Sequence, residues 1–374
     1  MKKNLFLAAF ACVALASCVN ESEPLLEESK GQPLTFGSPV MYNQSRLVGE
    51  ISGVTYPADE TFTVFGIEHN GDFAGWNANN VIKKEDGNDF FPAEGEVVTK
   101  GGNDSHWYTS KDYYLPTEPN YKLSFAAYSP SRAQGTDLIS IDGEETVAGF
   151  ILYGTDGLTI TNWRMPDANM YDLMYSKRTI NVKQDEVHIS FLHALSSIHV
   201  AFAKPELNGP YSVVVTKVAI KGADTSLSNV GTFKDRISED ADGQSALWSN
   251  LKTNNLPAEY PIFEGTYEVP VTTPAEPATN VRSFLPIPQN LTNDMKIILG
   301  YKIKMDADDD YELVNLEIPF LDFKIGGTGN ATGAWERAKR YTYNVTFGAL
   351  TKIKFHPSVT DWIPVQDAGT YVIK

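Results

Sequence analysis

Apolar and polar residues alternate along most of the chain, with the period of two that is typical of half-buried β-strands. In residues 295–305 three lysines fall on one face, while the opposite face is apolar and consists of Met295, Ile297, Leu299, Tyr301, Ile303 and Met305. Residues 121–127 and 341–347 show the same alternation, and clusters of glycine and proline separate such runs. The pattern predicts an all-β chain built mostly of antiparallel β-sandwiches.

The length of the chain predicts two domains. It has 374 residues, and a single hydrophobic core usually stops growing at about 250–300 residues. A polar stretch at residues 179–183 separates two strand-rich halves, so we expect an N-terminal sandwich over residues 34–181 and a C-terminal sandwich over residues 182–374. In the run "VHISFLHALSSIHVAF" the alternation changes phase at Ser196 and Ser197, which we interpret as a β-bulge.

Residues 1–17 have the features of a signal peptide. Two lysines precede a short apolar run, which is too short to cross a bilayer, and "LASC" places small residues directly before Cys18. This arrangement resembles a lipobox, so we expect cleavage before Cys18 and lipid, including palmitate, on the new N-terminal residue. The only other cysteine, Cys12, lies within the signal peptide, so no disulfide is expected in the mature protein.

Residues 18–33 are expected to be a tether. This stretch is rich in glutamate, serine, proline and glycine and cannot bury enough apolar surface to fold. The whole chain carries a net charge of −16 and has a pI near 4.8. Nucleic-acid binding and adhesion to anionic lipid both need a basic surface, so the charge argues against both partners.

Candidate chemistry is sparse. In "DADDDYE" the acidic residues alternate, and Glu317 takes the twelfth position of a calcium loop, but Tyr311 stands where such a loop needs glycine. We expect an acidic hairpin turn, with adventitious calcium binding as the alternative. His193 is expected to be a core histidine, and His188 and His199 are expected to face solvent. No motif predicts a catalytic residue, a metal site or a cofactor, so we expect no enzymatic activity.

The first folded segment, "PLTFGSPVMY", has alternating residues on one face, which are Leu34, Phe36, Ser38, Val40 and Tyr42. Pro39 lies inside this run, and proline cannot donate a ladder hydrogen bond, so we expect the strand at a sheet edge. A polar loop follows, with the bond between Arg46 and Leu47 as a candidate cleavage site for a trypsin-like protease. Cleavage there would separate the first strand and the lipid anchor from the rest of the chain.

The C-terminal segment "DWIPVQDAGTYVIK" is strand-like, with Ile363 and Val365, then Tyr371 and Ile373, as alternating apolar positions. A removable first strand and a strand-like tail are the two halves of strand addition between subunits. Apolar side chains of this size each contribute about 1.5–3 kcal/mol when they are buried.

In its order of segments the chain is similar to the fimbrillin-like family, the lipoprotein-derived (type V) pilins of anaerobic Gram-negative bacteria. The stretches that carry the resemblance are "LASC", "YYLP", "YKLSFAAYSP", "DLMYS", "VHISFLHALSSIHVAF", "FLPIPQNLTNDMKIILGYKI" and "AWERAKRYTYNVTF", followed by "KIKFHPSVTDW". The resemblance implies two tandem transthyretin-like β-sandwiches, an outer-membrane lipid anchor on Cys18 and a location on fimbriae at the cell surface. It also implies removal of the first strand at Arg46 and polymerisation with other fimbrial subunits through C-terminal donor strands.

Two alternatives remain open at this point. An uncleaved surface lipoprotein could act as a fimbrial anchor, or as a cell-adhesion protein that binds a host glycan or protein through Trp76, Trp107 or Trp163. The same tryptophans could equally fill the cores. An exported hydrolase has only the acidic turn in its favour.

Overall fold

The computed structural model describes residues 33–41, 56–76, 78–82, 90–92, 94–102, 105–131, 150–151, 159–165, 171–177, 179–184, 186–204, 211–223, 226–234, 248–271, 281–304, 310–323, 333–347 and 353–361. Every described element is a β-strand except for one short 3-10 helix, η2 (Phe320–Asp322). None of the described helical structure is long and apolar enough to cross a membrane. The predicted all-β fold is confirmed.

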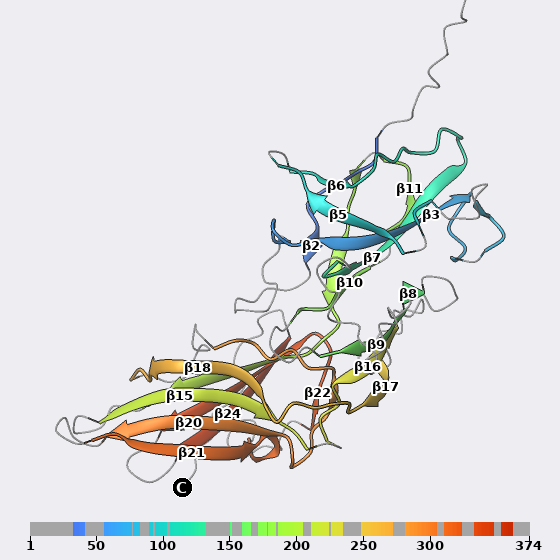
Figure 1. Cartoon of the computed structure of the whole chain (residues 1–374). Coiled ribbons are helices and arrows are strands. Elements are labelled where there is room, and N and C mark those ends of the chain that lie inside the picture. Colours follow the sequence, from blue (N-terminus) through green and yellow to red (C-terminus); the bar gives the residue numbers. More distant parts are fainter. Residues whose placement is uncertain are drawn as a thin grey trace, which may run out of the picture.

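The N-terminal part of the chain forms one eleven-stranded sheet, at the top of Figure 1. Its strands are β1 (Thr35–Phe36), β2 (Val40–Met41), β3 (Phe62–Asn70), β4 (Val81–Ile82), β5 (Glu96–Lys100), β6 (Trp107–Thr109), β7 (Tyr121–Ser129), β10 (Met174–Lys177), β11 (Thr179–Val182), β12 (Glu186–Val187) and β13 (Ser190–His193). They lie in the order β12-β1-β6-β5-β3-β7-β10-β13-β2, with β4 beside β3 and β11 beside β7.

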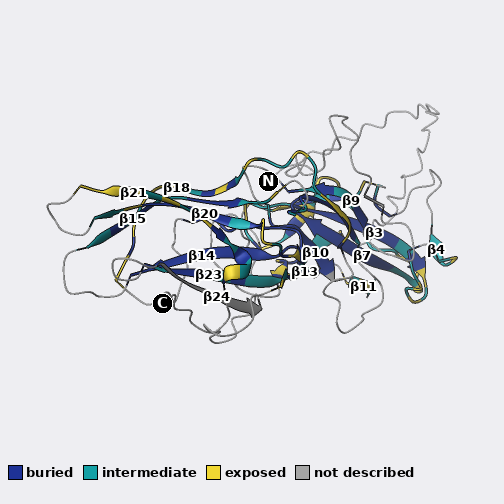
Figure 2. Ribbon diagram, turned by 90° about the horizontal axis from the view of Figure 1, so that it is seen from below, coloured by how far each residue is buried: buried dark blue, intermediate teal, exposed yellow. Residues whose placement is uncertain are grey.

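The other strands form four smaller sheets in the lower part of Figure 1. The strands are β8 (Phe150–Ile151), β9 (Thr159–Arg164), β14 (Ser197–Ala203), β15 (Ser212–Lys221), β16 (Val230–Lys234), β17 (Trp248–Lys252), β18 (Tyr260–Glu268), β19 (Gln289–Asn290), β20 (Lys296–Lys304), β21 (Glu312–Pro319), β22 (Ala334–Trp335), β23 (Lys339–Phe347) and β24 (Ile353–Asp361). The sheet β18-β15-β20-β21 faces the sheet β14-β23-β24, and the facing residues of β15, β20, β14 and β23 are buried (Figure 2). The sheet β17-β16-β9-β8 and the pair β19-β22 complete this half.

The long central strands β3 and β7 are buried on both faces because each face supplies a different core. Phe62 and Val64 of β3 belong to a core inside the N-terminal sheet. Phe65 and Ile67 point to the other side, into a larger core that continues through the C-terminal sheets. β-Branched and aromatic residues dominate these strands, which suits a position between two layers. The larger core therefore joins the two halves of the molecule.

Strand pairing crosses the expected boundary between residues 181 and 182 in both directions. β12 and β13 pair with β1, β2 and β10 in the N-terminal sheet. β9, which precedes the boundary, pairs with β16. The two-domain division and the transthyretin-like topology of each half stay predictions.

The phase change at Ser196 and Ser197 is a passage between two sheets, and the predicted β-bulge is wrong. β13 ends at His193 in the N-terminal sheet, and β14 begins at Ser197 beside β23. Between them, the Ser196 N–H donates to the carbonyl of Pro286 at 3.0 Å. A change of sheet and a bulge both shift the alternation by one residue, so the sequence pattern alone does not distinguish them.

The structure shows whether His193, His188 and His199 are buried or exposed. His193 is buried, as expected, and its Nδ1 lies 2.9 Å from Oδ2 of the buried Asp172. His188 is exposed, as expected. The expectation for His199 is wrong, because it is buried and its Nε2 lies within 3.0 Å of the hydroxyls of Ser197 and Ser283. These hydroxyls supply hydrogen-bond partners for Nε2 where solvent does not reach it.

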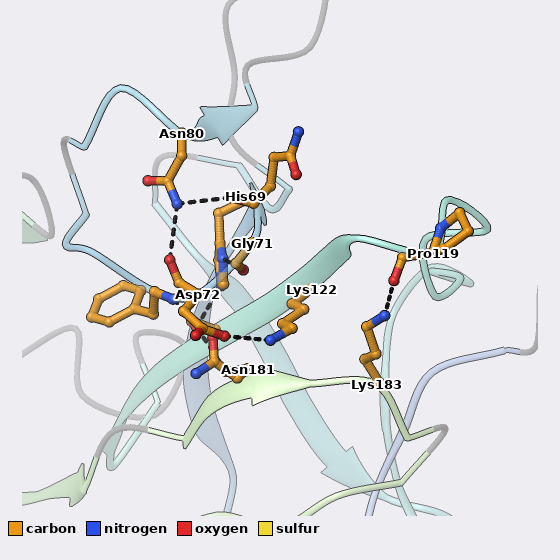
Figure 3. A network of polar contacts seen from close by, with 11 residues as sticks. His69, Gly71, Asp72, Asn80, Pro119, Lys122, Asn181 and Lys183 are labelled. Carbon is orange, nitrogen blue, oxygen red and sulfur yellow. Dashed lines mark hydrogen bonds and ion pairs between the residues drawn. The ribbon is translucent and has the colours of Figure 1, made fainter.

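A polar network at the tip of the N-terminal sheet holds the loop after β3 against β7 and β11 (Figure 3). His69 is fully buried, and its Nδ1 lies 3.0 Å from the carbonyl oxygen of Gly71. A carbonyl only accepts, so Nδ1 carries the proton and Nε2 accepts from the Ser124 hydroxyl at 2.8 Å. The Ser124 hydroxyl in turn accepts from the N–H of Asn181 at 3.2 Å. A neutral imidazole with its proton on Nδ1 satisfies both ring nitrogens in this arrangement.

Ion pairs and amide contacts reinforce the same tip. Lys122 pairs with Asp72, and the ammonium group of Lys183 donates to the carbonyl of Pro119. The side chain of Asn181 accepts from the N–H of Phe73 at 2.8 Å. Burial lowers the pKa of His69, and the charge of Lys122 lowers it further, against the opposing effects of the Gly71 carbonyl and of Asp72.

We expect the network to make folding stability pH-dependent. The folded-state pKa of His69 lies below its unfolded value of about 6.5, so the unfolded chain takes up the proton first as the pH falls. The free energy of unfolding should therefore decrease from pH 7.5 to pH 5, and less steeply in His69→Gln. Urea unfolding at a series of pH values measures both slopes. Equal slopes in the two proteins would contradict this role of His69.

Candidate functional site: the seat of the first strand

The first described segment, residues 33–41, lies between β6 and residues 186–193. On one side, Thr35 and Phe36 pair in parallel with Glu186 and Val187, and Val40 and Met41 pair in parallel with Ser190 and Phe191. On the other side, Phe36 pairs antiparallel with Trp107, and Pro33 forms a bridge to Tyr114. We call the channel between β6 and residues 186–193 the seat of the first strand.

The segment closes the N-terminal sheet on itself. β1 and β2 come from one stretch of chain, and β12 and β13 come from another. β12 and β1 lie at one end of the strand order, and β13 and β2 lie at the other end. The N–H groups of Gly37 and Val40 donate to the carbonyls of Val187 and Ile189 at 3.0 and 2.9 Å. Without residues 33–41 the ring of strands would open between β6 and residues 186–193.

Apolar side chains anchor the segment inside the ring. Leu34, Phe36 and Met41 are 6%, 0% and 2% exposed. The Phe36 ring packs edge-on against Phe62 and Phe125, with centroid distances of 6.1 and 5.9 Å. Such burial and ring contacts make Phe36 the main anchor of the first strand.

The two halves of the segment are out of phase. Four positions separate Phe36 from Val40, but their parallel partners Val187 and Ser190 are three positions apart, so one extra residue is accommodated around Gly37, Ser38 and Pro39. Val40 is consequently 45% exposed while Met41 is buried. The expectation that Val40 shares the buried face of Leu34 and Phe36 is wrong, and Tyr42 lies outside the described residues.

The expected edge position of the first strand is wrong for β1 and fits β2. β1 has strand neighbours on both sides, β12 and β6. Among the described strands, β2 pairs with β13 alone. Pro39 lies between β1 and β2, where its missing N–H leaves no gap in the pairing with residues 186–191. Its carbonyl accepts from the N–H of Tyr56 at 3.3 Å.

Polar side chains crowd the outer side of the segment at Gly37. A Cβ atom on Gly37 would lie 2.5 Å from Oε1 of Glu186 and 2.8 Å from Nδ1 of His188. Nε2 of His106, which precedes β6, lies 4.0 Å from the same Glu186 oxygen, and both side chains are about two-fifths exposed. The first strand thus passes under a cluster of side chains at the point where its phase changes.

The other predicted site residues divide into three groups. Cys18, Arg46, Leu47 and the tail residues Ile363, Val365, Tyr371 and Ile373 lie outside the described residues. Trp76, Trp107 and Trp163 are each 1% exposed, so they fill cores and offer no binding surface. β20 and β21, the strands on either side of the acidic stretch, pair antiparallel, and residues 305–309 between them lie outside the described residues. Glu317 forms ion pairs with Lys221 and Lys296. In the described part of the chain, no three His, Cys, Asp or Glu residues are placed to hold a metal ion.

We expect Phe36→Ala to destabilise the protein by about 3–5 kcal/mol, because it leaves a cavity between Phe62 and Phe125. Val40→Ala is the matched control in the same segment. Its side chain is 45% exposed, so its loss should change the free energy of unfolding by about 0.5 kcal/mol or less. Urea unfolding measures the change in the free energy of unfolding for both variants. Similar losses for the two variants would contradict the proposed anchoring role of Phe36.

Comparison with known proteins places this fold in a family. A family model for fimbrillin-like proteins matches residues 58–362. A fimbrial protein from Bacteroides vulgatus is 18% identical and has a TM-score of 0.53, with 88% of this chain and 99% of that chain covered. A fimbrial assembly protein from Parabacteroides distasonis is 14% identical, with a TM-score of 0.34 and coverage of 88% and 99%. No curated protein matched the chain.

The family match spans well over half of the sequence, from just after the first strand to Trp362. The likeness to the Bacteroides vulgatus structure extends to the all-β fold over most of both chains. Fimbrial proteins are structural components of the cell surface. This chain belongs to the fimbrillin-like family.

Proposed function

We propose that the protein is a structural or accessory subunit of a cell-surface fimbria, exported as a lipoprotein and assembled by donor-strand addition after its first strand is removed. The observation that carries this proposal is the seat of the first strand. Residues 33–41 complete the N-terminal sheet through backbone pairing and three buried side chains, Leu34, Phe36 and Met41. All of these contacts are non-covalent, so they can be exchanged for those of another strand.

The chain between the first strand and the next described residue supports strand removal. Residues 42–55 connect Met41 to Tyr56 and include the bond between Arg46 and Leu47. Cleavage of that bond would leave the first strand bound only by its contacts in the seat. The strand would then dissociate at a rate set by those contacts, and β6 and residues 186–193 would be free to bind another strand.

The N-terminal sequence supports delivery to the outer membrane. The "LASC" sequence before the acidic tether would place a lipid on Cys18, and about 15 extended residues would hold the folded part up to about 50 Å from the lipid surface. Cleavage at Arg46 would release the subunit from this anchor. One proteolytic step would therefore both free the subunit and open its seat.

The C-terminal segment is the proposed donor. Strand β24 ends at Asp361, and the 13 residues from Trp362 to Lys374 follow it. These residues include Ile363, Val365, Tyr371 and Ile373, and they are long enough to fill a seat that takes nine residues of the first segment. Other fimbrial subunits are thus the proposed partners.

N-terminal sequencing and intact-mass measurement of the protein from sheared filaments and from cell envelopes test the proposal. We expect the filament fraction to begin at Leu47 and to form ladders in non-reducing gels without heating. A filament fraction that still begins at acylated Cys18 would overturn strand removal. It would favour the alternative of an uncleaved lipoprotein that anchors the fimbria or acts as an adhesin.

A further inference from the structure

Strand β21 is a free edge of the C-terminal half. In the sheet β18-β15-β20-β21, which Figure 1 shows in this order from β18 down to β21, β20 is its single neighbour among the described strands. All eight residues of β21 pair with β20 without a shift in register. A regular edge of this length presents unpaired backbone N–H and C=O groups to a further strand.

Two other edges of the same sandwich carry features that discourage such pairing. β18, at the opposite end of the sheet, contains Pro261, and its pairing with β15 shifts register twice. β24, at the end of the facing sheet, has Pro357 in its middle. Prolines and bulges are common ways to protect an edge. In β21 the one proline is the last residue, Pro319.

The hydrogen bond that follows β21 shows which of its backbone groups are free. The N–H of Phe320 donates to the carbonyl of Met295 at 3.0 Å, in register with the ladder between β20 and β21. Residues of an antiparallel strand bond alternately to one side and to the other. The even-numbered residues of β21 therefore face β20, and Leu313, Asn315 and Glu317 direct their N–H and C=O groups outward.

The side chains of β21 give this edge apolar surface on both faces of the sheet. Leu313 is 59% exposed, more than any other described large hydrophobic residue. On the opposite face, Val314 and Leu316 are half-buried and pack against the larger core. A strand that paired with β21 would cover all three side chains, which favours its binding.

A second copy of β21 matches this edge. We consider antiparallel pairing about a two-fold axis at Asn315, which is the symmetry of an ordinary homodimer. The outward-bonding residues then face one another, with Leu313 opposite Glu317 of the second copy. On the inner face Val314 lies opposite Leu316 of the second copy, so the apolar rows of the two cores meet. The register thus satisfies the backbone and the apolar surface together.

The charges near the edge are also complementary in this register. Glu312 falls opposite Ile318, so no carboxylate faces another. Lys302 pairs with Leu313, is exposed and has no ion-pair partner among the described residues. Glu317 of the second copy lies on the same row, beyond Leu313, with its Cβ about 10 Å from that of Lys302. Two extended side chains of this length can close that distance, and the symmetry repeats the contact.

We propose that β21 binds β21 of a second copy of this chain, antiparallel and centred on Asn315, so that two four-stranded sheets become one continuous sheet. This contact joins two subunits side by side. It lies in the C-terminal half, away from the seat of the first strand, and it does not depend on cleavage or strand exchange. It is a lateral interface, distinct from the assembly described under the proposed function.

The first test uses the uncleaved mature chain with Cys18→Ser. Sedimentation equilibrium up to about 0.5 mM detects dissociation constants into the micromolar range. We expect a monomer–dimer equilibrium. Leu313→Glu should weaken it at least about tenfold, because a carboxylate then faces Glu317 in both symmetric pairs. The side chain at residue 313 is exposed, so the monomer should fold normally.

Leu313→Lys is the matched control at the same position. It places an ammonium group opposite Glu317 of the second copy, so association should stay within about threefold of the parent chain. Equal losses in the glutamate and lysine variants would overturn the register. A parent chain that remains monomeric over the whole concentration range would overturn the proposal.

The second test is disulfide formation across the axis. The mature chain with Cys18→Ser has no other cysteine, so a single added thiol reports one contact. Asn315→Cys places two thiols side by side at the axis, at a spacing that a disulfide can bridge. In the control, Leu313→Cys, the two thiols lie about 13 Å apart along the strands and cannot be bridged.

We expect rapid covalent dimerisation of Asn315→Cys and little of Leu313→Cys under the same mild oxidation, measured by non-reducing gels and intact mass. Equal rates for the two variants, or no dimer from either, would overturn the proposal. A monomeric Asn315→Cys protein whose thiol resists a labelling reagent would also overturn it, because another segment of the same chain would then cover the edge.

Discussion

The parallel pairing between residues 33–41 and residues 186–191 is the contact on which the N-terminal half depends. It joins the two ends of the strand order and turns an open sheet into a closed one. It also places Phe36 against Phe62 and Phe125, in the middle of the smaller core. Closure and core filling thus come from the same nine residues. A fold arranged in this way makes closure of the sheet depend on one short segment, which the proposed cleavage at Arg46 would detach.

The wall of the seat is held firmly because it continues into the junction with the C-terminal half. Residues 186–193 lead directly into Ala194, whose carbonyl accepts from the indole N–H of Trp248 at 2.7 Å. The next carbonyl, on Leu195, accepts from the N–H of Ala338 at 2.8 Å. Arg337 donates to the hydroxyl of Tyr175 at 2.8 Å and lies over its ring. A wall fixed at one end keeps its carbonyls aligned for the strand that pairs with it, which lowers the ordering cost of that pairing.

The sequence predicted the elements better than their connections. Alternation identified the strands around residues 295–305 and 341–347, because each has a buried apolar face and a more exposed polar face. It also identified the strand around residues 121–127, where Lys122 and Ser124 alternate with apolar residues although most of the strand is buried. The hairpin between β20 and β21 followed from two such runs separated by an acidic turn. The buried state of His193 followed from its apolar neighbours.

Pairing over long distances was not predictable in the same way. Nothing in "VHISF" indicates that Val187 and Ser190 lie beside residues 36 and 40, since parallel partners leave no local turn signal. The exposure of Val40 depends on the extra residue around Pro39, and the alternation of apolar and polar residues does not reveal that residue. His199 was misplaced because the hydroxyls that satisfy it include Ser283, 84 residues away. The misses share one physical cause, because each depends on a partner from a remote part of the chain.

An empty seat is unfavourable for two separate reasons, which under the proposed function tie removal of the first strand to its replacement. Loss of residues 33–41 would expose the apolar faces of Phe62 and Phe125 to water. It would also leave two strand edges, at β6 and at residues 186–193, with unpaired backbone groups. A side chain alone could relieve only the first defect. A strand relieves both at once, so the opened subunit favours a partner that brings main-chain hydrogen bonds and apolar side chains in a single extended segment.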